Sequence, residues 1–420
     1  MSLTRRSFIR TGSLSLAALS LGRPAPKTAA AHFGQELENI AAGVEPLEPE
    51  DYGLRKEKAR RLLAEHGLDA LFIGGGMNLL YFTKVGWWLS ERVFGVVLSR
   101  KRDPVWVCPA FEVKRAEELV PAGQEIRTWE EHEDPYEVVG GILRDIGAAA
   151  GKLGTAPDIR AFEIHGLRRS LPAVEVVDGA AVTEGCRGVK TAKEVAYMDL
   201  ANRITKLAYR EAFRALREGM TARDLAGAVS AAMQKLGAPG GAGPQFGPNT
   251  AFPHGSQVQR TLAQGDAVLV DGGCGVEGYR ADVTRTVVCG QPSDKQRRVW
   301  DVVRKAQAAA LAAARPGATC ESVDRAARKV VEDAGFGPGY RYFAHRLGHG
   351  IGMEGHEHPY LVQGNTLKLE PGMTFSNEPG IYIYGEFGVR TEDCMVVTET
   401  GARHLGGLEA ESIDRPFGPD

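Results

Sequence analysis

The first half of the chain alternates charged amphipathic segments with short apolar runs. This alternation continues to about Val177 and is typical of helices and strands that follow one another. The elements it predicts are a helix at Arg55–His66, strands at Asp69–Ile73, Val93–Leu98 and Val105–Cys108, and a helix at Phe111–Leu119. We therefore expect an α/β domain over residues 53–185, a normal size for one folded unit.

The second half has a different order of elements. Thr191 with Glu194, and Thr221 with Asp224, have the spacing of helix N-terminal capping boxes. The predicted order is two helices (190–217 and 221–236), strands on either side of Asp271 and Asp282, two more helices (293–315 and 321–334), and further strands. Helices, strands, helices and strands in this order indicate two similar halves of an α+β domain. We expect this domain over residues 186–410, with a tail at 411–420.

The N-terminus resembles a twin-arginine export signal. Arg5 and Arg6 precede a short apolar run, Thr11 to Leu21, and then Ala29-Ala30-Ala31. A buried helix or a membrane anchor is the alternative, but the run is shorter than the roughly 20 residues that span a bilayer. We expect residues 1–31 to be a signal peptide, residues 32–52 to be a linker, and the mature protein to be periplasmic or secreted.

Composition narrows the classes of partner. The formal net charge is −2, which argues against a nucleic-acid partner and against binding of the mature protein to an anionic membrane. Six cysteines occur without a Cys-x-x-Cys pair. We expect them to be mainly small buried residues, although an oxidising compartment leaves a disulfide open.

The segment from His345 to His358 is the strongest candidate for a site. It contains four of the chain's ten histidines, at 345, 349, 356 and 358, with glycines at 348, 350, 352 and 355. These glycines disfavour a helix and allow the backbone to approach a bound group closely. The segment also lacks the His-Glu-x-x-His pattern of a zinc-binding helix.

Four acidic residues on either side of this segment complete a candidate metal site with His349. Asp271 follows the apolar run 267–270, which we expect to end at the two glycines after it, and a hairpin would bring Asp282 close to it. Glu378 precedes a Pro-Gly turn, and Glu392 lies in a strand whose apolar end indicates burial. Buried together, four carboxylates require cations. Two divalent ions held by oxygen ligands and one imidazole would activate water and polarise a carbonyl group, so hydrolysis is the expected chemistry.

Taken singly, each of these residues also has an ordinary structural explanation. Asp282 would be an acid at a strand edge, Glu392 a salt-bridge partner of Arg390, and His349 a histidine bonded within its loop. Only the combination of the five, in this order, is specific.

The combined motifs resemble those of the pita-bread metallopeptidases, a group that includes methionine aminopeptidases, aminopeptidase P, prolidase and the metal-free creatinase. The motifs that carry the resemblance are Asp271-Gly-Gly, Ala281-Asp282-Val-Thr-Arg-Thr, His345-Arg-Leu-Gly-His349-Gly-Ile-Gly, Asn377-Glu378-Pro-Gly-Ile-Tyr and Arg390-Thr-Glu392-Asp. The first domain, through Asn78-Leu-Leu-Tyr81-Phe-Thr83, is similar to the creatinase/prolidase type. The resemblance implies an α+β pita-bread catalytic domain preceded by an α/β creatinase-like domain.

The resemblance also implies a role for each metal ligand. Asp271 would bind one ion, Asp282 and Glu392 would bridge both ions, and His349 and Glu378 would bind the other. Manganese is the first expectation for the two ions, with cobalt, zinc or iron as alternatives. Glu378 would also act as the proton shuttle for the attacking water.

Three further histidines match positions on the substrate side of the family's site. His254 and His356 would hydrogen-bond the substrate and stabilise the tetrahedral intermediate, His345 matches another pocket histidine, and His358 we expect at the rim.

The extra N-terminal domain points to the branch of the family that acts on Xaa-Pro bonds, because methionine aminopeptidases usually lack it. Creatinase does not keep the five ligands, so we do not expect its reaction. We expect an Xaa-Pro aminopeptidase that works through a metal-bridging hydroxide, with an Xaa-Pro dipeptidase (prolidase) as the alternative and a non-catalytic binding protein as a third reading. The expected partners are a peptide substrate and further copies of this chain in a homodimer or higher homo-oligomer.

Overall fold

The computed structural model describes residues 37–418. The predicted signal peptide and the first residues of the predicted linker lie outside this range. Within it, no helix combines the length and the apolar character needed to cross a membrane.

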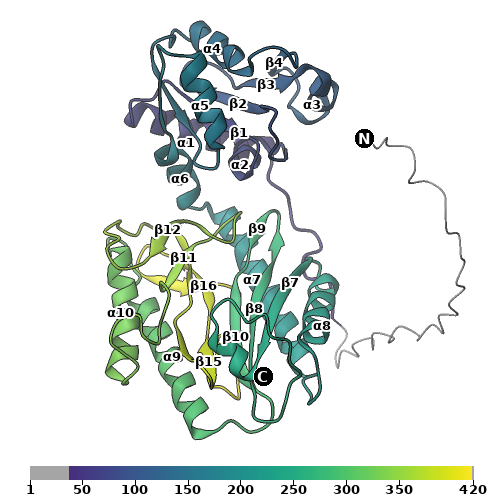
Figure 1. Ribbon diagram of the computed structural model, residues 1–420, viewed down its shortest axis with the longest axis vertical. Helices are drawn as coiled ribbons and strands as arrows, with labels where there is room; N and C mark the ends of the chain where they lie inside the picture. Colours follow the sequence, from purple (N-terminus) through teal and green to yellow (C-terminus); the bar gives the residue numbers. More distant parts are fainter. Residues whose placement is uncertain (1–36, 419–420) are drawn as a thin grey trace, which may run out of the picture. The chain divides into compact units, whose positions relative to one another are not determined.

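The N-terminal domain is built on one mixed sheet of six strands in the order β4-β3-β2-β1-β5-β6 (Figure 1). Strands β1, β2 and β3 are buried at every position, which explains their short, continuously apolar sequences. The strands are β1 (Ala70–Gly74), β2 (Gly95–Ser99), β3 (Val105–Pro109), β4 (Glu125–Trp129), β5 (Lys152–Thr155) and β6 (Glu175–Asp178). The α/β character predicted for this part is confirmed.

Helices connect and flank these strands. They are α1 (Pro49–Glu65), α2 (Met77–Thr83), η1 (Ala110–Glu112), α3 (Val113–Leu119), α4 (Pro135–Asp145), α5 (Ala161–Ser170) and α6 (Ala180–Gly188). Helix α1 starts at Pro49, within the predicted linker, because proline suits the first helical position and the Asp51 carboxylate accepts a hydrogen bond from the Glu48 backbone N–H at 2.7 Å. Helix α2 was not predicted.

The C-terminal domain repeats a pattern of two helices and a sheet. Its first half contains α7 (Ala192–Phe213), α8 (Ala222–Lys235), β7 (Gly240–Phe246), η2 (Gly247–Ala251), β8 (Ala267–Val276), β9 (Tyr279–Arg280) and β10 (Val283–Val288). The strands form an antiparallel sheet in the order β10-β8-β7, and β9 pairs with β8. Thr191 and Thr221 cap α7 and α8 as the sequence predicts, each accepting a hydrogen bond from a backbone N–H three residues later.

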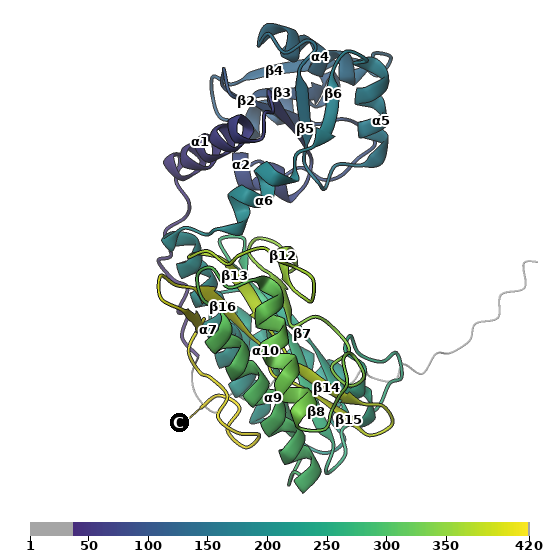
Figure 2. The same ribbon diagram turned by 90° about the vertical axis from the view of Figure 1, so that its left-hand side faces the viewer.

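The second half contains α9 (Asp294–Ala313), α10 (Cys320–Asp333), β11 (Gly348–Gly350), β12 (Glu357–Leu361), β13 (Thr374–Asn377), β14 (Gly380–Ile383), β15 (Phe387–Arg390), β16 (Asp393–Val397) and β17 (Ala402–His404). Its main sheet has the order β12-β11-β13-β16-β17, and β14 pairs with β15. Helices α9 and α10 lie side by side (Figure 2) and form an apolar core with this sheet. The predicted two-part α+β domain is confirmed.

Two details of this domain differ from the prediction. Strand β8 does not end after Asp271 but continues to Val276. Gly272, at φ 147°, and Gly273 permit very close neighbours: a Cβ at Gly273 would lie 2.1 Å from the Ala281 oxygen. The glycines therefore allow strands to approach closely instead of ending one. The predicted tail is also packed as far as it is described, since Ile413 and Phe417 are buried.

All six cysteines are buried and free. The expectation of small buried residues is therefore confirmed, and no disulfide joins them.

Candidate metal centre and active site

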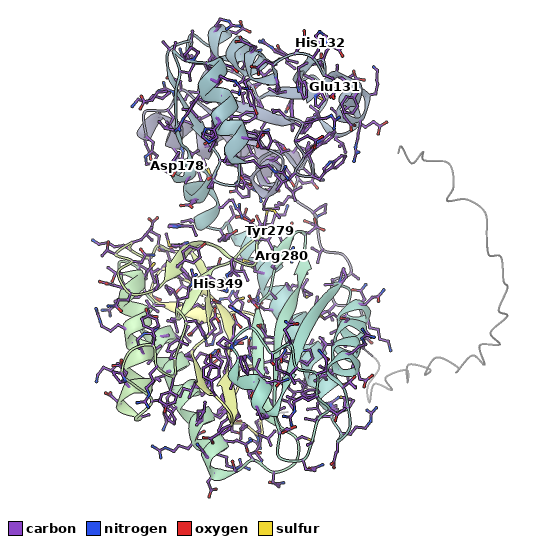
Figure 3. The ribbon with its side chains drawn as sticks, in the orientation of Figure 1. Glu131, His132, Asp178, Tyr279, Arg280 and His349 are labelled. Carbon is purple, nitrogen blue, oxygen red and sulfur yellow. The ribbon has the colours of Figure 1, made fainter. Side chains whose placement is uncertain are left out.

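The five predicted metal ligands come from both halves of the C-terminal domain and meet in its interior. Asp271 lies on β8, Asp282 directly before β10, and His349 on β11, while Glu378 and Glu392 lie in the β13–β14 and β15–β16 junctions. Figure 3 shows His349 among the strands. Ligand atoms of Asp271, Asp282 and Glu392 lie within 4.8 Å of one another, as do those of His349, Glu378 and Glu392. Glu392 belongs to both groups, which is the arrangement that two adjacent ions need.

Local hydrogen bonds orient His349 and Glu378. The Ser376 hydroxyl accepts from the His349 backbone N–H at 3.0 Å and donates to Glu378 Oε1 at 3.0 Å. The His349 Nδ1 lies 3.0 Å from the carbonyl oxygen of Gly350, so Nδ1 carries the proton and Nε2 is free to bind a metal. That Nε2 faces Glu378 Oε1 at 3.3 Å.

The shared ligand Glu392 is held from two sides. The Thr284 hydroxyl donates to Glu392 Oε2 at 2.6 Å, and Arg285 Nη1 donates to the backbone oxygen of Glu392 at 2.7 Å. Thr284 lies two residues after Asp282, and it pairs with Asp271 across the β8–β10 ladder. The predicted hairpin therefore brings the two aspartates together.

The site carries more negative charge than its own cations neutralise. Burial, with the nearby Asp271, raises the pKa of Asp282 to about 7. Burial, with the nearby Asp282, raises the pKa of Glu392 well above its ordinary value. Carboxylates destabilised in this way favour divalent cations, and oxygen ligands with one imidazole suit manganese, cobalt, iron or catalytic zinc. These residues therefore fit a dinuclear metal centre.

Arg390 is the protein's own counter-charge to Asp271. Its Nη2 lies 2.6 Å from Asp271 Oδ2, and its Nη1 donates to the Tyr382 hydroxyl at 2.9 Å. The alternative pairing with Glu392 is looser, at 3.8 Å. Sequence reasoning considered Arg390 only as a partner of Glu392 and gave Tyr382 no role. The alternating pattern of residues along β14 and β15 was the signal in the sequence that pointed to Tyr382 and Arg390. That Asp271 is the partner of Arg390 becomes clear only in the folded sheet.

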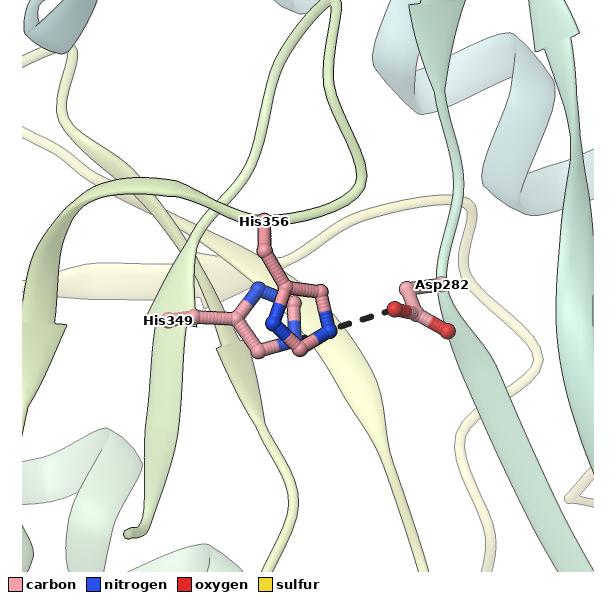
Figure 4. A group of neighbouring side chains, drawn as sticks. All are labelled: Asp282, His349 and His356. Carbon is pink, nitrogen blue, oxygen red and sulfur yellow. Dashed lines mark ion pairs between the residues drawn. The ribbon is translucent and has the colours of Figure 1, made fainter. Parts of the chain in front are cut away.

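A cavity of about 170 Å³ opens onto these ligands. All four predicted catalytic residues, His254, His345, His356 and Glu378, line it. The His356 ring lies parallel to that of His349, with centroids 3.6 Å apart and a 13° interplanar angle, and Asp282 faces His349 Nε2 at 3.7 Å (Figure 4). The remaining lining residues are Pro253, Asp271, Asp282, Arg346, His349, Arg390 and Glu392. His358 is not among them.

His345 is tied to the same network. Its Nε2 lies 2.8 Å from the Tyr382 hydroxyl, and its Nδ1 lies 2.7 Å from the Arg346 carbonyl oxygen. Burial lowers the pKa of His345, and burial together with His349 lowers the pKa of His356. Both rings are therefore neutral near neutral pH.

Comparison with known proteins agrees with this geometry. Residues 196–399 match the model of metallopeptidase family M24, and residues 55–189 match the creatinase/prolidase N-terminal domain. An Xaa-Pro dipeptidase of Lactobacillus helveticus is 36% identical, with 82% of this chain and 94% of the relative covered. The crystal structure of dipeptidase PepE from Mycobacterium ulcerans superposes with a TM-score of 0.80 at 34% identity, covering 86% of this chain and 96% of that one. An X-Pro aminopeptidase from Thermotoga maritima has a TM-score of 0.71 at 27% identity, covering 83% and 96%. The chain belongs to metallopeptidase family M24 and carries a creatinase/prolidase-type N-terminal domain.

Proposed function

We propose that this metallopeptidase is an Xaa-Pro dipeptidase that depends on two divalent ions. The observation that carries the proposal is the group of five ligands around one small cavity. The motifs alone led us to expect an aminopeptidase first. The relative named Xaa-Pro dipeptidase, matched over 94% of its length, supports the dipeptidase alternative better.

When bound, the two ions supply an activated water molecule and polarise the scissile carbonyl group. Asp271 would hold one ion, His349 and Glu378 the other, and Asp282 and Glu392 both. Manganese is our first proposal for their identity.

Glu378 is the proposed proton shuttle. Burial alone would raise its pKa, but the hydrogen bond and charge of His349 outweigh burial and lower the pKa to about 2. With the ions bound, their positive charge would take over this role from His349, and the ionised carboxylate would accept a proton from the attacking water. It then gives that proton to the proline nitrogen, which has no hydrogen of its own in the Xaa-Pro bond and must gain one to leave.

His254 and His356 are proposed to bind the substrate. Neutral imidazole offers one N–H donor, and His356 presents its ring directly above that of His349. A donor in this position stabilises the negative oxygen that develops when the carbonyl group is attacked. His345 holds Tyr382, and through it Arg390, in place.

Metal analysis of the purified protein, together with assays on Gly-Pro and Arg-Pro-Pro, tests the proposal. We expect two ions per chain and hydrolysis of Gly-Pro only. Release of arginine from the tripeptide would instead support an aminopeptidase, and absence of both activities with metal bound would support a binding role.

We also propose that the protein is exported by the twin-arginine route and that copies of the chain associate. The export signal lies outside the described residues, so fractionation of cells expressing wild type and an Arg5→Lys, Arg6→Lys variant is the appropriate test. Retention of the variant in the cytoplasm is expected. Light scattering of the mature protein measures its oligomeric state, for which a homodimer is the smallest expected form.

A further inference from the structure

His356 belongs to the loop of residues 351–356, which joins β11 to β12. Its ring lies parallel to that of His349, but in the described part of the chain no group forms a hydrogen bond with it. An imidazole that stabilises a developing charge must be held at one place, because the preorganised position of the donor is what lowers the barrier. The place of the His356 ring therefore depends on what fixes its loop.

Two acidic residues flank His356, and one guanidinium group contacts both of them. Arg187 Nη2 donates to Glu354 Oε2 at 2.7 Å and to Glu357 Oε2 at 2.5 Å. The Lys190 ammonium donates to the other oxygen of Glu357, Oε1, at 2.7 Å. Arg187 and Glu357 are 9% and 8% exposed, and a charged pair this deeply buried is sensitive to the loss of either partner. Arg187 therefore holds the loop on both sides of His356.

The Glu357 carboxylate also lies against the loop itself. A Cβ at Gly352 would lie 2.5 Å from Glu357 Oε1, so the carboxylate occupies the space that a larger residue would fill. Burial opposes ionisation of Glu357, but Lys190 and Arg187 lower its pKa. The carboxylate is therefore ionised near neutral pH, and its contact with Arg187 is a pair of full charges.

Arg187 is itself fixed from the N-terminal domain. It lies on α6, and its Nη1 donates to Asn78 Oδ1 at 3.1 Å. Asn78 is buried and starts the segment Asn78–Thr83, for which the metal centre offers no role. Helix α6 also carries Glu184, whose Oε2 lies 3.4 Å from His358 Nδ1. Since residues 55–189 match the N-terminal domain model, this domain holds the chain on both sides of His356.

We propose that Arg187 is a positioning residue, which keeps His356 at its place in the catalytic cavity by holding the two acids that flank it. The inference rests on the proposed function, in which His356 stabilises the negative oxygen of the attacked carbonyl group. A displacement of about 1 Å can lower the rate of such a reaction by about 100-fold. Arg187 thus contributes to catalysis although it does not line the catalytic cavity.

A double-mutant cycle in the metal-loaded enzyme, assayed on Gly-Pro, tests this inference. Arg187→Gln should lower kcat/KM by about 10- to 100-fold, mainly through kcat, because the negative oxygen exists only in the transition state. His356→Phe keeps an aromatic ring at this position and removes its N–H donor. In that background Arg187→Gln should have less than about a 2-fold further effect, since the donor that it positions is absent. Independent roles would instead give effects that multiply.

Arg55→Gln is the matched control. Arg55 is also a buried arginine of the N-terminal domain that pairs with a carboxylate of the C-terminal domain, since its Nη2 lies 2.7 Å from Glu194 Oε1. Its loss should also lower the free energy of unfolding, but any effect on kcat/KM should multiply with that of His356→Phe. The two arginine variants therefore separate a general loss of stability from a displacement of His356.

Nuclear magnetic resonance of the zinc-loaded protein, labelled in its histidine rings with a stable isotope, reports on His356 without turnover. The signal that is absent from His356→Phe identifies this ring. It should shift in Arg187→Gln and stay unchanged in Arg55→Gln. An unchanged signal in folded Arg187→Gln, or effects of Arg187→Gln and His356→Phe that multiply, overturns the inference.

If circular dichroism shows that Arg187→Gln does not fold, Glu354→Gln takes its place, because it removes only the partly exposed side of the contact. A smaller loss of kcat/KM that disappears in the His356→Phe background is then expected, and a loss that persists there overturns the inference. Failure of wild type to hydrolyse Gly-Pro overturns the proposed function instead. The resonance of His356 then decides by itself whether Arg187 positions this ring.

Discussion

Without its metal ions, the protein should lose stability as the pH rises. This is the opposite of ordinary acid denaturation, in which stability is lost as the pH falls. The reason is the carboxylate cluster, in which burial and Asp271 raise the pKa of Asp282 from 3.8 to about 7. Between these two values the folded protein holds a proton that the unfolded chain has released. Stability from this group is therefore complete below the unfolded pKa and is lost as the pH rises through the folded one.

The size of the effect follows from the two pKa values of Asp282. Between about pH 5 and about pH 8, this carboxyl group alone should remove about 2–3 kcal/mol of stability. In domains of comparable size, each kcal/mol corresponds to about 2–4 °C in melting temperature. The metal-free protein should therefore melt about 5–10 °C lower at the higher pH. Glu392, whose pKa is also raised, acts in the same direction.

Differential scanning calorimetry of chelator-treated protein at the two pH values measures this loss, and added Mn²⁺ should restore stability at the higher pH. Asp282→Asn, also metal-free, should show a weaker pH dependence, because only the contribution of Glu392 would remain. Asp333→Asn is the control, since Asp333 is exposed and pairs with Lys329 on the surface. If wild type and Asp282→Asn show the same pH dependence, excess negative charge is not what the ions neutralise.

Other variants probe single parts of the site and its support. Glu378→Gln should lower kcat by at least about 100-fold with an unchanged circular dichroism spectrum, and near-normal turnover would exclude Glu378 as the proton shuttle. Asp393→Asn should lower the free energy of unfolding in urea by about 3–5 kcal/mol, because Lys206, 2.6 Å from Asp393, would stay buried without its carboxylate. The exposed control Asp333→Asn should lower it by less than about 1 kcal/mol. Equal losses in the two variants would contradict the argument. Gly272→Ala should lower the melting temperature and weaken metal binding, because residue 272 has a φ of 147° and the added Cβ would lie 2.4 Å from a backbone oxygen. An unchanged melting temperature and metal affinity would show that the neighbouring strand shifts freely.

The helices of the second domain could be predicted because their signals are local. Thr191 and Glu194 are three residues apart, and the capping bonds they predict form within the first turn of α7. The clustering of the five proposed metal ligands could be predicted because their short motifs, taken together and in this order, resemble those of a known family. Neither prediction needed to know which strands are neighbours.

The glycines after Asp271 show where local reasoning fails. A Gly-Gly pair is compatible both with the end of a strand and with the close approach of two backbones. The second explanation holds here because β7 and the segment before β10 lie against β8. That information lies about thirty residues away on one side and about ten on the other, so no window around Asp271 contains it.

The distribution of charge in the site also depends on the fold. It explains why the pKa values of the two proposed shared ligands, Asp282 and Glu392, are raised. Arg390 pairs closely with Asp271, 2.6 Å away, and lies 3.8 Å from Glu392. The protein therefore neutralises a carboxylate at the edge of the cluster and leaves Asp282 and Glu392, the two with raised pKa values, at its centre. Each of them, like His349, occurs in two groups of potential ligands. A cation supplied by the chain at that central point would exclude the ions, so the deficit of positive charge is a requirement of the site and not a defect of the packing.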